Sequence, residues 1–394
     1  MTKAGVRRFW ASVHRWTGLT TMAFLLIAAV TGCLLCFDGP IDAALNPDLF
    51  KAPGAGAPMA PTEVIDRLEQ ARPDLVVTQF PLHARPGETL KVAVAPRDAA
   101  MNPGFDQVFL DPHDGHIVGT RRIGPGLDRR HIVQAVYLFH YTLLAGTWGR
   151  WLMGVVALAW LISNGVGFYL TLPAGKPFWR KWRPMWTLEL GAPLRRLMLD
   201  IHRAGGLWLL IGLTVLAFTS VSMNFFDEAF TPMVSAISPA RPSPFDRPPD
   251  RLARTGPTAA GFAQALGAAQ DAARRQGLGW EPAVLSWVPE RGLYGVMFTP
   301  SRFEAYRALG PVSFYVDART GRVAYADDPY HDSAGRGFSR AIYPLHTGKI
   351  AGPLGVALIF LLGLATAEMC VTGFYTWWKN RRPPQAPRRA PSRA

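Results

Sequence analysis

The chain has 394 residues, and 42 lysines and arginines against 28 acidic residues give it a net charge of +14. Residues 1–15, 173–203 and 377–394 together hold 17 basic and two acidic side chains, so the rest of the chain is close to neutral. A nucleic-acid-binding protein would carry its positive charge within a recognition module. Because the charge here is confined to segments beside apolar runs, we exclude nucleic acid as a partner.

Four apolar runs adjoin the basic segments. They cover residues 16–37, 151–172, 204–226 and 353–376, and Glu368 is the only full charge within them. A helix of about 20 apolar residues crosses the ~30 Å hydrocarbon core of a bilayer. We therefore predict four transmembrane helices, with the lipid bilayer as a partner.

The basic flanks predict the orientation, because lysine and arginine are enriched on the cytoplasmic side of membrane proteins. Both termini should face the cytoplasm, and the loops at about 38–150 and 227–352 should lie outside. The first 37 residues also resemble a signal peptide. We interpret them as an uncleaved anchor, because the apolar run continues past Cys33 and an equivalent run recurs in mid-chain.

The first outer loop begins with a linker rich in proline, glycine and alanine. The apolar spacing then predicts a helix over 62–72 and strands at 75–80, 89–94, 107–110 and 116–120. The second loop repeats this plan, with a helix over 258–276 and strands at 284–288, 293–298, 313–316 and 323–325. Asp114-Gly115 and Thr320-Gly321 fit hairpin turns between the last two strands of each set. Each loop should form a small α+β domain with one helix on an antiparallel sheet.

The fold class predicted is thus a membrane α-helical protein with α+β outer domains. We divide the chain into 1–37 (N-terminus and first span), 38–130 (first outer domain), 131–172 (outer helix and second span), 173–203 (basic cytoplasmic loop), 204–226 (third span), 227–340 (second outer domain), 341–376 (fourth span) and 377–394 (basic tail).

The two halves of the chain correspond at many positions. His14 and His202 lie 188 positions apart, and His140 and His346 lie 206 apart. The offset of 206 also relates Tyr137 to Tyr343, Gly146 to Gly352, Gly149 to Gly355, and Gly167-Phe168-Tyr169 to Gly373-Phe374-Tyr375. So many matches at one offset indicate a duplication. We predict two parallel repeats, each made of a span, an outer domain and a second span.

The predicted topology places the repeated histidines in two pairs. His14 and His202 lie at the inner ends of the first and third helices, and His140 and His346 lie at the outer approaches to the second and fourth. A b-type haem can be held by two neutral imidazoles from different helices. We therefore predict two haems b, with these four histidines as axial ligands of the iron. On one continuous helix, however, His140 would stand ~15 Å beyond the apolar span.

Other interpretations of the quartet stay open. The histidines could bind another metal, or they could be interfacial residues without a ligand. Methionine is an alternative axial ligand, available at Met22, Met153, Met198, Met223 and Met369.

Further residues could complete the haem sites. Glycines near the histidines would leave room for a flat ring; these are Gly18, Gly205, Gly206, Gly146, Gly149, Gly348 and Gly352. Arg15, Arg203 and Arg150 could pair with haem propionates. Glu368 could orient a ligating histidine, or it could be a protonated, packed side chain.

The remaining histidines and cysteines have simpler explanations. His113 and His116 flank a predicted turn and should be solvated; His83, His131 and His331 should lie on the surface, although the last two could face a substrate. Cys33, Cys36 and Cys370 should be small buried side chains, with a redox pair at Cys33 and Cys36 as the minority interpretation. The absence of Cys-x-x-Cys-His excludes covalent c-type haem attachment.

The histidine motifs together resemble those of the PepSY-associated transmembrane family. The resemblance rests on His14-Arg15-Trp16-x-Gly18-Leu19, on Leu-Phe before His140, on Pro-Leu before His346, and on the Asp-x-x-x-Gly hairpins. It covers the chain from His14 to about Trp378.

This resemblance implies a bacterial inner-membrane oxidoreductase with two periplasmic PepSY-like domains and two haems b. Such a protein would pass electrons across the membrane to a ferric siderophore and release Fe(II). The electron donor would be an unidentified partner, because the chain has no Gly-rich nucleotide-binding fingerprint. Two rival functions remain: a haem subunit that feeds another acceptor such as a quinone, and a haem-free membrane module that binds a peptidase or a cell-wall component.

Overall fold

The computed structural model describes residues 2–98, 100–246, 261–302 and 307–381. It divides into two compact units. The helical unit is drawn from Met1–Cys33, His140–Asn224 and Ile359–Ala394, and the sheet unit from Leu34–Phe139 and Phe225–Leu358. Each unit thus takes segments from both halves of the sequence.

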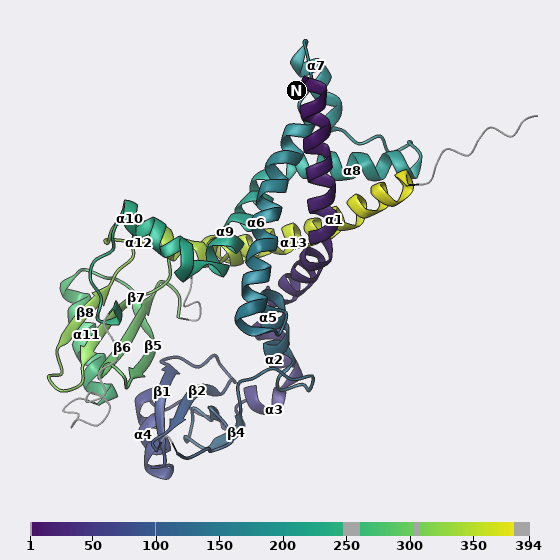
Figure 1. Cartoon of the computed structure of the whole chain (residues 1–394). Coiled ribbons are helices and arrows are strands. Elements are labelled where there is room, and N and C mark those ends of the chain that lie inside the picture. Colours follow the sequence, from purple (N-terminus) through teal and green to yellow (C-terminus); the bar gives the residue numbers. More distant parts are fainter. Residues whose placement is uncertain (1, 99, 247–260, 303–306, 382–394) are drawn as a thin grey trace, which may run out of the picture. The chain divides into compact units, whose positions relative to one another are not determined.

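Among the described residues, three helices are long and apolar enough to cross a membrane (Figure 1). They are α1 (Lys3–Leu35), α6 (Gly146–Thr171) and α13 (Gly352–Asn380), whose most apolar stretches have mean hydropathies of 2.1, 1.6 and 2.2. These helices contain the first, second and fourth predicted spans, which are confirmed as helices.

The third span is broken, and this corrects the continuous helix predicted over 204–226. α8 (Leu194–Trp208) and α9 (Leu210–Asn224) meet at 72° on either side of Leu209. α8 is amphipathic, whereas α9 is apolar. If the two formed one straight helix, the charged side chains of α8 would lie in line with the apolar span. Two glycines at 205–206 also weaken the last turn of α8. The chain therefore has four spans only if the bent pair counts as one.

Short helical segments connect the larger elements. α7 (Phe178–Trp182) and η1 (Arg183–Trp186) lie in the basic loop before α8. The others are α2 (Asp38–Leu45), α3 (Pro47–Phe50), α5 (Ile132–Thr142), η2 (Phe226–Phe230), α10 (Thr231–Ile237), η3 (Pro244–Asp246), α12 (Ala334–Thr347) and η4 (Lys349–Ala351).

All eight predicted strands are present. They are β1 (Leu75–Pro81), β2 (Leu90–Pro96), β3 (Gln107–Leu110), β4 (Ile117–Arg121), β5 (Glu281–Val288), β6 (Leu293–Thr299), β7 (Val312–Asp317) and β8 (Val323–Asp327). The two predicted helices correspond to α4 (Pro61–Ala71) and α11 (Phe262–Arg275). The hairpin turns are also as predicted, since Gly115 and Gly321 have φ of 79° and 66°, which a glycine adopts without strain.

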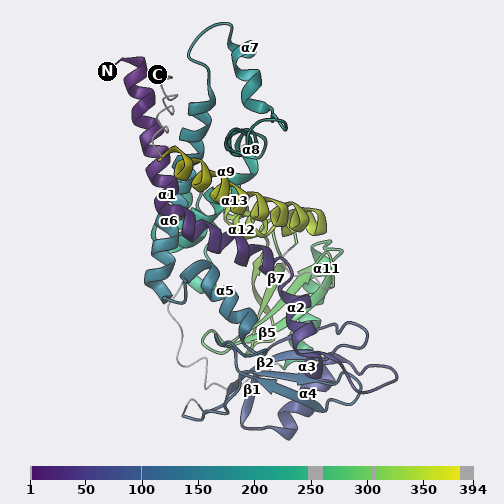
Figure 2. The same ribbon diagram turned by 90° about the vertical axis from the view of Figure 1, so that its right-hand side faces the viewer.

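The eight strands form one antiparallel sheet, in the order β4-β3-β2-β1-β5-β6-β7-β8 (Figure 2). Four strands come from each half of the sequence, and the halves join where β1 pairs with β5, with Phe80 opposite Leu285. A single hydrophobic core continues across this junction, with α4 and α11 packed against it. Phe80 of β1 contacts Phe262 of α11 at 5.1 Å between ring centroids. The two α+β halves are therefore one folded body rather than two separate sheets.

Candidate functional site

The four repeated histidines all lie on helices. His14 is on α1, His202 on α8, His140 on α5 and His346 on α12. The first three belong to the helical unit, and His346 belongs to the sheet unit.

His14 and His202 come together, as the sequence predicted. Their ring centroids are 6.3 Å apart and the ring planes meet at 62°. An imidazole nitrogen binds a metal at about 2.0 Å and lies about 1.1–1.2 Å from its own ring centroid, so two imidazoles on opposite sides of one metal have centroids about 6.3 Å apart. The observed separation equals this value, and it also lies within the range of ordinary edge-to-face ring contacts.

Both rings of this pair are fixed through Nδ1. His14 Nδ1 lies 2.8 Å from Ser163 Oγ, and His202 Nδ1 lies 3.1 Å from both the Met369 carbonyl and Thr372 Oγ1. Among the described residues, the Nε2 atoms of the two rings have no hydrogen bond. Metal-binding histidines commonly use one nitrogen for the metal and the other for such a hydrogen bond.

His140 has a similar environment. Its Nδ1 lies 3.0 Å from Thr31 Oγ1, and its ring packs against Gly32 of α1. The concern that His140 would stand far beyond the span depended on a continuous helix. The chain instead ends α5 at Thr142, turns through two leucines at 143–144 with positive φ, and restarts at Gly146 as α6.

Several glycines predicted to make room for haem instead shape corners of the chain. Gly146, Gly348 and Gly352 have φ of 56°, 76° and 62°. A Cβ on Gly149 would overlap the Thr142 carbonyl, and one on Gly355 would overlap the Gly348 carbonyl. These glycines thus allow the turns before α6 and α13. Gly18 does face open space, whereas Gly206 packs against Met369.

The three predicted propionate partners differ in their surroundings. Arg203 donates to the Asp200 carboxylate at 2.7 Å, and Asp200 is 1% exposed. Arg150 donates to the carbonyl of Asn224. Arg15 is exposed on α1. To bind a haem propionate, Arg203 would have to break its hydrogen bond to Asp200 or donate to both groups at once.

Glu368 lies in α13 near the pair, although no hydrogen bond from it to a histidine is found. Its Oε1 is buried without a hydrogen-bond partner, and its Oε2 lies 3.9 Å from the place of a Cβ on Gly205. Cys33 is buried as predicted, whereas Cys36 and Cys370 are only partly buried, and none of the three forms a disulfide within the described part of the chain. Within the described ranges, no three or more His, Cys, Asp or Glu side chains gather as a metal-binding group.

The other histidines make local hydrogen bonds in the sheet unit. His113 Nδ1 lies 2.7 Å from the Asp111 carboxylate in the predicted turn, and His116 is exposed. His131 and His331 each lie 2.7 Å from an aspartate three residues earlier, Asp128 or Asp328, and His83 Nε2 lies 3.1 Å from the Pro282 carbonyl. The hydrogen bond from His131 lowers the pKa of Asp128.

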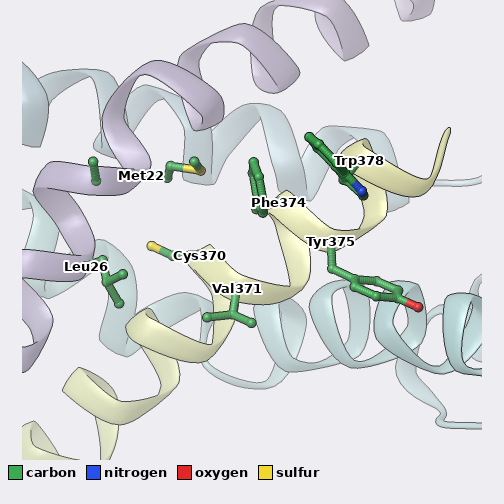
Figure 3. Close-up of a pocket in the computed structure, with 8 residues that line it drawn as sticks. Met22, Leu26, Cys370, Val371, Phe374, Tyr375 and Trp378 are labelled. Atoms are coloured by element: carbon green, nitrogen blue, oxygen red, sulfur yellow. The ribbon is translucent and has the colours of Figure 1, made fainter. Parts of the chain in front are cut away.

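An apolar groove of about 450 Å³ lies between α1 and α13 (Figure 3). Met22 and Leu26 project from α1, opposite Cys370 and Phe374 of α13. Its lining is Met22, Ala23, Leu26, Cys370, Val371, Phe374, Tyr375 and Trp378. None of the repeated histidines lines this groove, so it is separate from the histidine pair.

Sequence reasoning missed the hydroxyl partners of the histidine pair, Ser163 and Thr372, and also Asp200, the carboxylate partner of Arg203. The sequence did contain a signal for the two glycines that contact the histidine pair. Gly167 and Gly373 are related by the offset of 206, and the rings of His14 and His202 pack against them. Thr31 and Ser163, in contrast, have no distinguishing sequence context.

Comparison with protein families identifies one match. The model of the family described as PepSY-associated TM region matches residues 11–380, which is most of the chain. No curated protein matches the sequence.

Proposed function

This chain belongs to the PepSY-associated TM family, and we propose that it is a haem b oxidoreductase that passes electrons across a bacterial inner membrane to a ferric siderophore. The observation that carries the proposal is the pair of imidazoles from α1 and α8, with centroids 6.3 Å apart. The four repeated histidines are the proposed iron ligands, and both termini are proposed to face the cytoplasm.

The residues around the pair support the proposal by holding both imidazole rings in place. A Cβ on Gly167 or Gly373 would lie 3.1 or 3.0 Å from the Cε1 atom of the adjacent histidine, so the rings occupy space that only glycine leaves. His14 and His202 would hold one haem iron through Nε2. By the repeat, His140 and His346 would serve the second site.

A haem held by two histidines supplies one-electron transfer and has no open position for oxygen chemistry. The role of the protein in electron transfer is to hold the two imidazole rings in a fixed orientation, so that they do not move when the iron changes its oxidation state. Ser163, Thr372 and the Met369 carbonyl do this through Nδ1, at 2.8–3.1 Å.

The proposed acceptor follows from the chemistry of iron. Siderophores bind Fe(III) through hard oxygen ligands and hold Fe(II) weakly, so one electron releases the metal without destroying the chelator. This part of the proposal rests on the resemblance to the family, because no siderophore site is defined by the described residues.

The deciding experiment is an optical spectrum of the purified protein, oxidised and then reduced, with a haem-to-protein ratio. We expect a low-spin b-type spectrum and about two haems per chain. His202→Ala should remove one haem, whereas His113→Ala, a turn histidine, should keep both. A wild-type protein that stays colourless with ample haem supply would refute the proposal and favour the haem-free module.

The acceptor is tested separately. The reduced protein should be reoxidised by a ferric siderophore, and His140→Ala or His346→Ala should abolish this reaction while the His14–His202 haem remains. Reoxidation by a quinone but not by any ferric siderophore would contradict the siderophore assignment and leave the haem assignment intact.

A further inference from the structure

Three of the repeated histidines rest on a glycine of a neighbouring helix. In each case a Cβ built on that glycine would lie closer to the Cε1 atom of the ring than almost any real Cβ contact allows. The distance is 3.1 Å for Gly167 and His14, 3.0 Å for Gly373 and His202, and 3.1 Å for Gly32 and His140.

For Gly167 and Gly373, the residue four positions earlier also contacts the ring. The Met369 carbonyl lies 3.1 Å from His202 Nδ1. The Ser163 hydroxyl oxygen lies 2.8 Å from His14 Nδ1. A helical side chain covers the turn on its N-terminal side, so a glycine leaves the carbonyl four residues earlier open to a neighbouring donor.

A hydroxyl group completes each contact. Ser163, Thr372 and Thr31 place their hydroxyl oxygens 2.8, 3.1 and 3.0 Å from the Nδ1 atoms of His14, His202 and His140. The Met369 carbonyl can only accept a hydrogen bond, so the His202 Nδ1 atom beside it must carry the proton. Thr31 Oγ1 donates its proton to the Ile27 carbonyl and is therefore left to accept one from His140 Nδ1. In a neutral imidazole the other nitrogen, Nε2, then keeps its lone pair.

We propose that Gly32, Gly167 and Gly373 are positioning residues that fix these histidines in the Nδ1–H tautomer and thereby make Nε2 the metal-binding nitrogen. The metal-binding part rests on the proposed haem function. The tautomer itself does not, because the carbonyl and hydroxyl groups that set it are present without any ligand; for His14, whose partner is the Ser163 hydroxyl, the tautomer is inferred from its correspondence with His202. The device occurs at equivalent places in the two repeats, since Gly167 and Gly373 are related by the offset of 206.

The test compares Gly167→Ala with Gly165→Ala. Both positions are in the same helix, and alanine favours a helix more than glycine does, so neither change weakens α6 by itself. A Cβ on Gly165 meets nothing within 4 Å, whereas one on Gly167 meets the His14 ring. Gly165→Ala is therefore a matched control.

Two measurements on the full-length protein separate this inference from the proposed function. The first is the ¹⁵N shifts of histidine-labelled protein before haem is added, which report the tautomer of each ring. The second is haem affinity with the electron paramagnetic resonance spectrum of the loaded protein. We expect Gly167→Ala to lose the Nδ1–H signature of His14, to bind haem roughly tenfold more weakly and to shift the low-spin signal. Gly165→Ala should match the wild type.

Identical ¹⁵N shifts in Gly167→Ala and Gly165→Ala would overturn the inference, and so would a wild-type His14 with its proton on Nε2. If the wild-type protein binds no haem, the haem proposal fails, and the ¹⁵N comparison still decides whether the glycine fixes the tautomer.

Discussion

Replacing Phe80 by alanine should loosen both halves of the sheet, because its side chain belongs to a core that the halves share. Phe80 is fully buried on β1, and its ring meets Phe262 of α11 edge to face at 5.1 Å. Removing a fully buried phenylalanine side chain costs about 3–5 kcal/mol, through lost burial and the cavity left behind. This loss should lower the free energy of local unfolding of β1 and of α11 by similar amounts.

Hydrogen exchange of the purified protein in detergent measures this opening by segment. We expect protection to fall at Leu75–Pro81 and at Phe262–Arg275 by a similar free energy. Gln79→Ala is the control, since Gln79 is the exposed neighbour on the same strand and should change stability by less than about 0.5 kcal/mol. Unchanged protection of α11 in Phe80→Ala would refute the shared core and show two independent domains.

Three further predictions concern single sites. Gly149→Ala should destabilise the corner before α6 by about 1–3 kcal/mol, because a Cβ there overlaps a backbone carbonyl; an unchanged thermal midpoint would contradict this. Asp200→Ala should cost about 3–5 kcal/mol, because it leaves the largely buried Arg203 without its carboxylate, and thermal unfolding in detergent measures it. Asp48→Asn should remove a pH-dependent contribution to stability, since the hydrogen bond from Arg129 lowers the pKa of that carboxyl below its ordinary 3.8. The stabilisation is complete above 3.8 and is lost as the pH falls through the lower, folded-state pKa. The difference in melting temperature between wild type and variant should therefore be at its full size at about pH 6 and shrink as the pH is lowered below 3.8.

The strands were predictable because each has a local signal. Their burial alternates along the chain, as in β1, and Gly115 and Gly321 mark the hairpins. The pairing of β1 with β5 was not predictable, because it joins segments about 200 residues apart and no local pattern specifies which edges meet.

The candidate site was predictable only in its main residues. The repeat pointed to His14 and His202, and the structure brings their rings together. The bend at Leu209 was missed, because the apolar count over 204–226 does not register that α8 is amphipathic and α9 is not. The hydroxyl partners were missed because serine and threonine occur throughout apolar helices, where they usually bond their own backbone.

The junction between β1 and β5 has a symmetry of its own. Gln79 pairs with Ser286, Phe80 with Leu285 and Pro81 with Val284. Under the offset of 206, residues 79 and 80 correspond to 285 and 286, so each strand faces its own counterpart in reverse, as in the isologous interface of a twofold dimer. A single repeat would present this same edge to a second copy of itself. The junction of the joined chain thus has the strand geometry of a self-complementary pair, while the residues that face one another across it differ.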